Sequence, residues 1–139
     1  MFGYGKMSGC AVAAVSALAE VHGQGLTLSS AEIAASRNFS QALVAKILTR
    51  LSQKGFVVGT RGPGGGYRLA MDPGKVTLHQ IVEVFEGHRD TSGCPFGPGW
   101  CGTGDPCPLH DALVAMQKNM EAKLRKLTFK SFIAHPKGG

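Results

Sequence analysis

The fold of this 139-residue chain is decided by a glycine-rich stretch near its middle, Arg61-Gly-Pro-Gly-Gly-Gly-Tyr-Arg-Leu69. Short strand candidates lie at residues 56–58 and 67–69. Pro63 presets a φ angle suited to a turn, and the glycines accept the positive φ angles that tight turns need. The stretch therefore predicts a β-hairpin with Arg61 at the base of its turn. A nucleotide-binding loop is disfavoured because a strand, not a helix, follows the glycines.

Two short predicted helices with a tight turn between them precede the hairpin. Ser29 and Glu32 have the spacing of a capping box, which begins a helix that ends near Ser36. Ser40 caps the next helix, which ends at Lys54-Gly55. The apolar positions of that helix follow helical spacing, at Val44, Ile47, Leu48 and Leu51. An ordinary helical hairpin would show the same spacing, but the β-hairpin that follows favours a winged helix-turn-helix.

A winged helix-turn-helix binds double-stranded DNA through two elements. The second helix of the pair enters the major groove with its N-terminal residues against the base edges. The wing reaches phosphates or the minor groove, where the planar guanidinium of Arg61 suits either contact. The predicted DNA-binding residues are therefore Ser40, Gln41, Ala42, Ala45 and Lys46 in the helix, and Arg61, Gly64 and Gly65 in the hairpin.

The formal net charge of +6 is unevenly distributed along the chain. Residues 1–70 carry seven Lys/Arg against two Asp/Glu, residues 71–111 carry two against six, and residues 112–139 carry six against one. A basic N-terminal half suits contacts with DNA phosphates, which supply most of the sequence-independent affinity. Charge alone is weak support, because solvated protein faces often look the same.

The first predicted helix runs from about residue 7 to residue 22 and ends at Gly23 and Gly25. Residues 10–19 also resemble the apolar region of a secretory signal peptide, but here apolar residues share one helix face, which such a peptide does not need. No apolar run reaches the roughly 18 residues needed to span a bilayer. We therefore expect a cytoplasmic protein without a membrane segment, in which thiols stay reduced.

Two further helices are predicted in the C-terminal half. Thr77 and Gln80 form a capping box for the first, which is expected to pack on the hairpin. The second begins after Pro108 and has a narrow apolar stripe at Leu109, Leu113, Met116, Met120, Leu124 and Leu127. Such a stripe favours pairing with the same helix of a second copy over packing against its own domain. One end of this helix is expected to be covered by three apolar tail residues, Phe129, Phe132 and Ile133.

Residues 93–108 form a Pro- and Gly-rich segment that cannot build a core of its own. Four candidate metal ligands lie in or just after it, namely Cys94, Cys101, Cys107 and His110. The paired short spacings of structural zinc sites are absent, which favours an iron–sulfur cluster held by three thiolates and one different ligand. Zinc, a metal-free thiol–disulfide switch and cysteines acting as small hydrophobes remain as alternatives. Cys10 is interpreted as a buried thiol or as an alternative fourth ligand.

The hairpin Arg61–Leu69 resembles, almost letter for letter, the wing of the IscR/NsrR family of bacterial winged-helix regulators, also called the Rrf-two family. The cysteine and histidine array resembles the cluster-binding branch of that family, although its first cysteine gap is one residue longer than the commonest pattern. The resemblance spans nearly the whole chain. It implies a homodimer with crossed long helices, a two-fold operator in DNA, and a [2Fe-2S] or [4Fe-4S] cluster.

The resemblance also implies roles for individual residues. The thiolate ligands, the histidine ligand and the wing arginine of the family are matched by Cys94, Cys101, Cys107, His110 and Arg61. The nitric-oxide-sensing branch takes a carboxylate ligand from the first helix, near the position that Gly9 occupies here. The recognition-helix positions that frequently hold Glu-Gln are Ala45-Lys46, so the best-known operator of the family is not carried over.

Together these features predict a mostly α-helical protein with a small β-hairpin wing. Its parts are a winged helix-turn-helix domain at residues 1–87, a cysteine-rich cluster-binding loop at 88–108, and a dimerisation helix with its tail at 109–139. The predicted function is a repressor that senses iron, redox state or nitric oxide through an iron–sulfur cluster. A metal-free repressor responding to thiol oxidation or a small ligand is the alternative. An enzyme is disfavoured, since the sequence has no catalytic triad, paired carboxylates or cofactor fingerprint.

Overall fold

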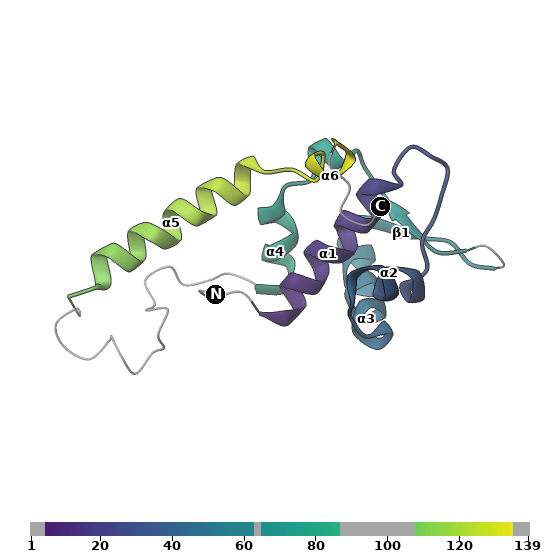
Figure 1. Ribbon diagram of the computed structural model, residues 1–139, viewed down its shortest axis with the longest axis horizontal. Coiled ribbons are helices and arrows are strands. Elements are labelled where there is room, and N and C mark those ends of the chain that lie inside the picture. Colours follow the sequence, from purple (N-terminus) through teal and green to yellow (C-terminus); the bar gives the residue numbers. More distant parts are fainter. Residues whose placement is uncertain (1–4, 63–64, 87–107, 135–139) are drawn as a thin grey trace.

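The computed structural model describes residues 5–62, 65–86 and 108–134 (Figure 1). Its elements in chain order are α1 (Lys6–Glu20), α2 (Ser30–Arg37), α3 (Gln41–Gln53), β1 (Val57–Gly59), β2 (Tyr67–Leu69), the 3₁₀ helix η1 (Pro73–Lys75), α4 (Leu78–Glu86), α5 (His110–Lys126) and α6 (Ser131–Ala134). The strands pair as an antiparallel hairpin. This order confirms the predicted, mostly helical architecture with a hairpin after a helix pair.

The ends of α2 and α3 are set by the short-range motifs that the sequence predicts. The capping box at α2 is complete, because Glu32 N donates to Ser29 Oγ and Ser29 N donates to Glu32 Oε1, both at 3.1 Å. Asn38 ends α2 in the left-handed conformation, with φ of 60°. At the end of α3, Phe56 N donates to Leu51 O across Gly55, whose φ is 85°. This arrangement is a Schellman motif, and it turns the chain directly into β1.

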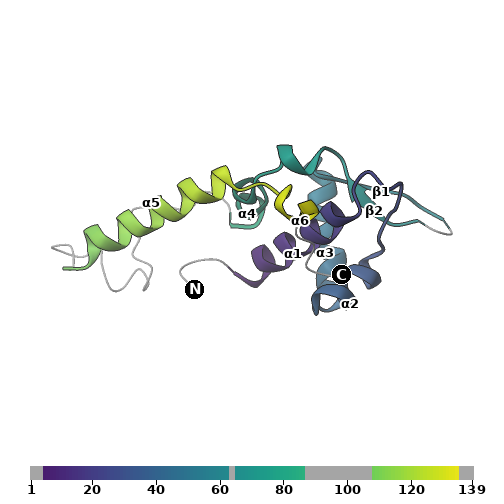
Figure 2. The ribbon, with the colours of Figure 1, turned by 45° about the horizontal axis from the view of Figure 1, so that its top comes forward.

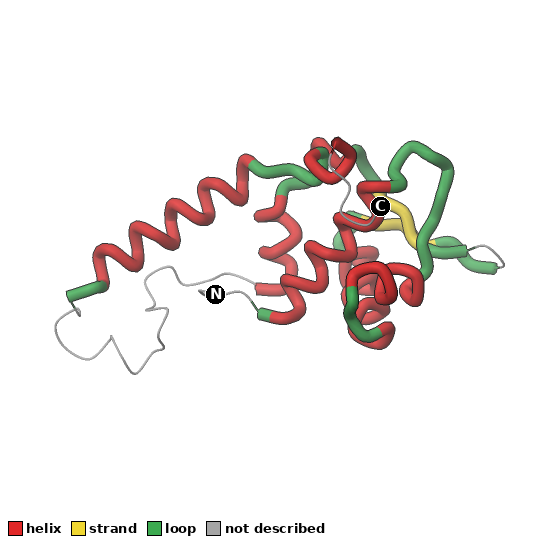
Figure 3. The backbone as a smooth tube through the Cα atoms, viewed as in Figure 1, coloured by secondary structure: helices red, strands yellow, loops and turns green. Residues whose placement is uncertain are grey.

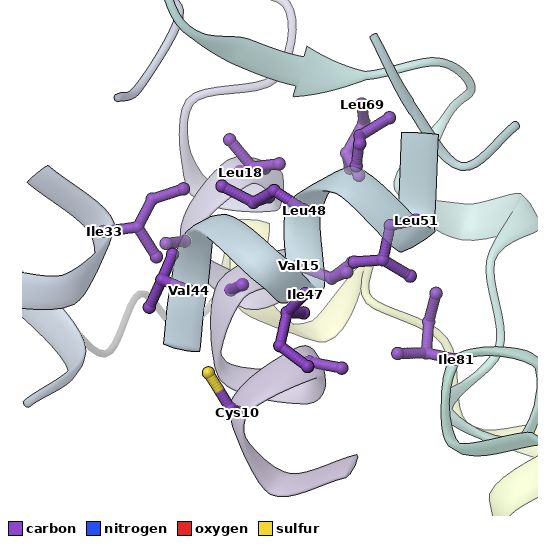
Figure 4. Packing of buried hydrophobic residues seen from close by; sticks show 14 of the residues in the cluster. Cys10, Val15, Leu18, Ile33, Val44, Ile47, Leu48, Leu51, Leu69 and Ile81 are labelled. Atoms are coloured by element: carbon purple, nitrogen blue, oxygen red, sulfur yellow. The ribbon is translucent and has the colours of Figure 1, made fainter. Parts of the chain in front are cut away.

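The core lies between α1, α2 and α3 and extends to the hairpin and α4 (Figure 4). Small residues of α1, among them Ala11 and Ala14, let its neighbours approach closely. Its larger side chains Val15 and Leu18 fill the space beneath α3. The apolar residues that the helical spacing of α3 predicts as core are all fully buried, namely Val44, Ile47, Leu48 and Leu51.

The hairpin pairs Val57 with Leu69 and Gly59 with Tyr67. Strand β1 begins one residue later than the sequence predicts, because the backbone N–H of Phe56 is used to close α3. The loop before α2 runs beside β2 (Figure 3), where Leu28 and Tyr67 exchange backbone hydrogen bonds of 3.0 Å and 2.7 Å. The hairpin is therefore fixed to the start of the helix pair.

Helix α4 packs on α1 and also contacts α5. Its capping box is formed as expected, with Gln80 N donating to Thr77 Oγ1 and Thr77 N donating to Gln80 Oε1. The prediction that this helix packs on the hairpin is wrong. The inward residues of the short strands, Val57 and Leu69, are already buried against α3 and α1, so the apolar face of α4 covers α1 instead.

Helix α5 and the hairpin project from opposite ends of the molecule (Figure 1 and Figure 2). None of the residues of α5 is buried. Its C-terminal end is held at the start of α4, where Leu78 N donates to Leu127 O at 3.0 Å. In the described ranges, neither α5 nor another helix is long and apolar enough to cross a membrane.

The tail after α5 returns to the core of the helix-turn-helix half. Phe129 is fully buried, its backbone N–H donates to Val76 O at 3.1 Å, and its ring stacks on Phe132. The expectation that the tail covers one end of α5 is therefore wrong for Phe129 and Phe132. The physical reason is that backbone pairing between residues 76–78 and 127–129 directs these rings toward α1 rather than along α5.

Candidate nucleic-acid interface

The outward face of α3 carries the side chains predicted to read DNA. Gln41, Ala42 and Lys46 are exposed, and Ala45 is partly buried. The opposite face of the helix is fixed in the core. The predicted side chains therefore lie on a rigid element in helical register, as recognition of base edges in a groove requires.

Ser40 has a structural role at the start of α3. Its Oγ accepts a hydrogen bond from Leu43 N at 3.2 Å, and its carbonyl accepts one from Val44 N at 3.1 Å. The cap uses an acceptor lone pair of the hydroxyl and leaves its hydrogen available. Ser40 can therefore cap the helix and donate to a DNA phosphate at the same time.

The wing turn is closed by hydrogen bonds on both sides of residues 63 and 64. Thr60 N donates to Gly66 O at 2.8 Å, and Gly65 N donates to Gly62 O at 2.9 Å. Arg61 lies within this closed turn with an exposed side chain. The N–H of Gly65 is used inside the turn, so this glycine shapes the wing. Gly64, the other glycine predicted to contact DNA, lies outside the described residues.

The glycines of the wing are required by two different constraints. Gly62 has a φ of 97°, a conformation that side chains with a Cβ rarely adopt. At Gly65 the constraint is space, because an added Cβ would lie 2.5 Å from Thr60 O and 2.8 Å from Gly62 O. The glycines thus allow a tight turn, and Arg61 lies at the base of this turn, directly after Thr60.

The basic residues of the N-terminal half fall into two groups. Arg37 is withdrawn from solvent, because its Nη2 lies 2.6 Å from Glu20 Oε2 and its side chain is 6% exposed. Its Nε also donates to Ser16 Oγ at 3.2 Å, so this arginine joins α2 to α1. Lys46 and Arg61, in contrast, are exposed on α3 and the wing. These exposed cations, and not Arg37, are available to phosphates.

The sequence-based prediction omits three residues on the same face of α3, namely Thr49, Arg50 and Gln53. All three are exposed and, with Lys46, line a surface groove between α3, the start of α1 and the end of α4. They follow Lys46 by three, four and seven positions, a helical spacing that would have identified them. Arg50 is also tied to α4, since its Nε donates to Val84 O at 3.4 Å.

The predicted metal ligands are only partly within the described structure. Cys94, Cys101 and Cys107 lie outside it, and His110 is the partly buried first residue of α5. The Cys10 thiol is fully buried in α1 (Figure 4), and this burial raises its pKa, an effect that Lys6 partly offsets. This environment favours the buried-thiol interpretation of Cys10. Among the described residues no group of three His, Cys, Asp or Glu side chains could hold a metal.

Comparison with known proteins identifies the family. The model of the Rrf2 family, described as an iron-dependent transcriptional regulator, matches residues 5–135. The chain belongs to the Rrf2 family. This membership confirms the resemblance found from the wing and cysteine motifs, and a family of transcriptional regulators agrees with the expectation that the chain is not an enzyme.

Curated relatives of the chain include regulators named IscR. The chain is 32% identical to IscR of Cronobacter sakazakii over 80 residues, which cover 58% of this chain and 49% of the relative. It is 29% identical to IscR of Klebsiella pneumoniae over 98 residues, which cover 70% and 60%. The chain thus spans about half the length of the first of these relatives and somewhat more of the second.

Solved Rrf2-type structures confirm the fold along almost the whole chain. CymR (YrzC), the global cysteine regulator of B. subtilis, superposes with a TM-score of 0.79 at 21% identity, covering 97% of this chain and 98% of CymR. IscR of T. potens superposes with a TM-score of 0.74 at 23% identity, covering 95% and 86%. At these identities the likeness supports the winged-helix fold and no finer property.

Proposed function

We propose that this chain is a cytoplasmic, DNA-binding transcriptional repressor whose affinity for its operator depends on an iron–sulfur cluster. The observation that carries the DNA-binding part is the joint exposure of Lys46 on α3 and Arg61 on the wing, with both elements held on one core. The observation that carries the sensing part is the group of four candidate ligands between residues 94 and 110. The cluster would respond to iron, redox state or nitric oxide.

The DNA-binding step follows from the placement of the two elements. The N-terminal turn of α3 would enter the major groove, where Gln41 and Lys46 reach base edges and Ser40 donates to a phosphate. Arg61 would lie over the phosphates or in the minor groove beside that site. Ala42 and Ala45 present methyl groups, which suit contact with thymine methyls.

A two-fold homodimer is part of the proposal. No residue of α5 is buried, and two apolar residues, Leu109 at its N-cap and Met116 within it, are 52% and 55% exposed. A second copy of α5 would cover this stripe and place two copies of α3 on a two-fold operator. The winged half and α5 would then act as the separate domains predicted from the sequence, joined by the cysteine-rich loop.

The donor set fits an iron–sulfur cluster. Three thiolates, from Cys94, Cys101 and Cys107, are the ligand type that such clusters require, and an imidazole from His110 would complete the set. The bound cluster would supply one-electron redox chemistry and a centre that oxidants and nitric oxide can attack. His110 stands at the first position of α5, so it would link the ligand segment to the proposed dimer helix. The buried Cys10 thiol is a poorer ligand, because metals bind thiolates.

The metal-free alternative has its own support. Besides CymR of B. subtilis, the similar folds include Staphylococcus aureus CymR and an oxidised form of it. In this alternative, oxidation of the three cysteines that precede α5 in the sequence would change DNA affinity without a metal. If cluster removal left DNA affinity unchanged while peroxide abolished it, this alternative would replace the cluster proposal.

Replacing Arg61 with alanine is expected to weaken operator binding by about 1–3 kcal/mol, because a side chain that reads a specific feature contributes that much. The measurement is a DNA titration by fluorescence anisotropy at several salt concentrations. The matched control is Lys130→Ala, which removes an exposed cation beside η1 and outside the predicted DNA-binding residues. Equal losses for both variants would contradict a specific role, and a change in salt slope alone would make Arg61 a phosphate contact only.

The cluster is tested by anaerobic purification followed by iron and sulfide analysis and an absorption spectrum. We expect bound iron and acid-labile sulfide, with Cys107→Ser losing the cluster and His110→Ala retaining a more labile one. The control is Cys10→Ser, which is expected to keep the cluster. A colourless protein with stoichiometric zinc, or no metal after reconstitution, would show the cluster proposal to be wrong.

A further inference from the structure

The C-terminal end of α4 is hydrogen-bonded to two other helices, once to α3 and once to the start of α1. The last four carbonyls of a helix have no partner within it, and in α4 one of these belongs to Val84. Arg50 of α3 donates its Nε–H to this oxygen at 3.4 Å. The carboxylate of Glu86 accepts the backbone N–H of Gly5 at 3.1 Å, at the start of α1. The same turn of α4 therefore receives a cap from α3 and provides one to α1.

Both caps are electrostatically favourable. The Arg50 guanidinium lies at the negative end of the α4 dipole, and the Glu86 carboxylate lies at the positive end of the α1 dipole. Helix α1 has no acidic residue in its first turn, and its N-cap, Gly5, has no side chain to supply a cap. Glu86 thus supplies from α4 the N-terminal interaction that the sequence of α1 lacks.

This junction is continuous with the surface proposed to bind DNA. Lys46, Thr49, Arg50 and Gln53 of α3 line one groove with Met7 of α1 and with Val84 and Phe85 of α4. Arg50 follows Lys46 by one helical turn on the same exposed face. A shift of the end of α4 would therefore act on α3 next to a residue proposed to contact DNA.

The junction also lies next to the proposed sensor in the sequence. Glu86 ends α4, and Cys94 follows it by eight positions. A change in how the segment from Cys94 to Cys107 is held would reach α4 through the turn that carries Val84 and Glu86, because that turn precedes the segment in the sequence. That turn has bonded contacts to both α3 and α1.

We infer that Arg50 is a positioning residue that couples the end of α4 to recognition helix α3 and so transmits the state of the cysteine segment to DNA affinity. The inference rests on the proposed function for the signal and for the DNA-binding role of α3. Arg50 belongs neither to the predicted DNA-binding residues nor to the predicted metal ligands. It would connect the two sites through the end of α4. The route consists of the Arg50–Val84 hydrogen bond, with the Glu86–Gly5 bond steadying the same turn.

The contact itself is tested in the cluster-free full-length protein by amide hydrogen exchange and mass spectrometry. In Arg50→Ala, amides of residues 82–86 are expected to exchange about threefold to tenfold faster, as loss of a helix-capping hydrogen bond predicts. Lys54→Ala is the matched control, because it removes an exposed cation at the C-cap of α3 that does not line the groove at the junction. Unchanged exchange at residues 82–86 in Arg50→Ala would overturn the coupling.

The transmission is tested by the ratio of DNA affinities between cluster-loaded and cluster-free protein. Arg50→Ala is expected to bring this ratio toward one, by about threefold or more, whereas Lys54→Ala is expected to keep the ratio. Glu86→Ala is the second variant, since it disturbs the same turn without altering α3, and it is expected to shift the ratio in the same direction.

The outcomes separate the inference from the proposed function. If the wild-type ratio differs from one and Arg50→Ala lowers both affinities equally, Arg50 is a simple DNA contact and the inference is overturned while the proposed function stands. If wild-type protein takes up no cluster, or its ratio is one, the proposed function fails and the regulatory role of Arg50 fails with it. The exchange experiment still reports in that case whether Arg50 holds the end of α4.

Discussion

Phe129→Ala is expected to lower the free energy of unfolding by about 3–5 kcal/mol, the usual cost of truncating a buried phenylalanine. Phe129 is fully buried, with 0% of its surface exposed, and it lies in the same core cluster as residues of α1 and α3. Truncation would leave a cavity where the tail meets the core. Because single domains are stable by only about 5–15 kcal/mol, the loss is a large part of the total.

The measurement is urea denaturation followed by circular dichroism. The matched control is Ile133→Ala in the same tail, where the side chain is 49% exposed and a change within about 0.5 kcal/mol is expected. Phe129→Leu provides a milder variant, expected to lose less than about 1.5 kcal/mol, in case the alanine protein does not fold. Similar losses for Phe129→Ala and Ile133→Ala would show that the tail does not pack as described.

The burial of Phe129 fixes one end of α5 to the core of the winged half. The C-terminal end of α5 is fixed to the start of α4 by the bond from Leu78 N to Leu127 O, and Phe129 holds that connection in the core. The N-terminal end of α5 begins at His110, next to the cysteine segment in sequence. In the proposed function, a cluster held by the segment between α4 and α5 would act on the C-terminal end of α4, while the N-terminal end of α4 stays bonded to the end of α5.

Features that depend on neighbouring residues could be predicted from the sequence. The capping box at Ser29, the cap at Ser40 and the capping box at Thr77 each need only residues three positions apart, and all three are formed. The buried face of α3 follows equally from helical spacing. The wing could be predicted because its glycines are required by the turn itself, as the φ of Gly62 illustrates.

Features that depend on distant pairing could not be predicted in this way. The position of Phe129 is set by the backbone hydrogen bond from its N–H to Val76 O, and Val76 lies 53 positions earlier. The packing of α4 on α1 depends on the inward residues of the hairpin, Val57 and Leu69, being already buried against α3 and α1. On the candidate interface, Lys46 and Arg61 could be predicted because each is a basic residue in an element that contacts DNA in winged helices. The exposed position of Arg50 follows from its helical spacing to Lys46, but its hydrogen bond could not be predicted, because the acceptor is a backbone oxygen on another helix.

Gly66→Ala is expected to reduce the free energy of unfolding by about 1–3 kcal/mol, as overpacking of a close contact does, and to weaken operator binding as well. A Cβ at this position would lie 2.8 Å from the carbonyl carbon and oxygen of Leu28 and 3.1 Å from Ser29 N. All three are backbone atoms at the start of α2, so no side chain can move aside. Relief requires the hairpin to separate from the loop before α2, which breaks the Leu28–Tyr67 pairing and displaces Arg61.

The matched control is Gly9→Ala, another glycine-to-alanine change with the opposite expected sign. Gly9 is exposed within α1, and an added Cβ would meet nothing within 4 Å, so the variant should gain about 0.5–1 kcal/mol from better helix propensity. Urea denaturation and DNA titration on both variants separate the two effects. A Gly66→Ala protein with wild-type stability and wild-type DNA affinity would contradict the close packing of the wing on the helix pair. Loss of DNA affinity without loss of stability would place the effect of Gly66 in the orientation of the wing alone.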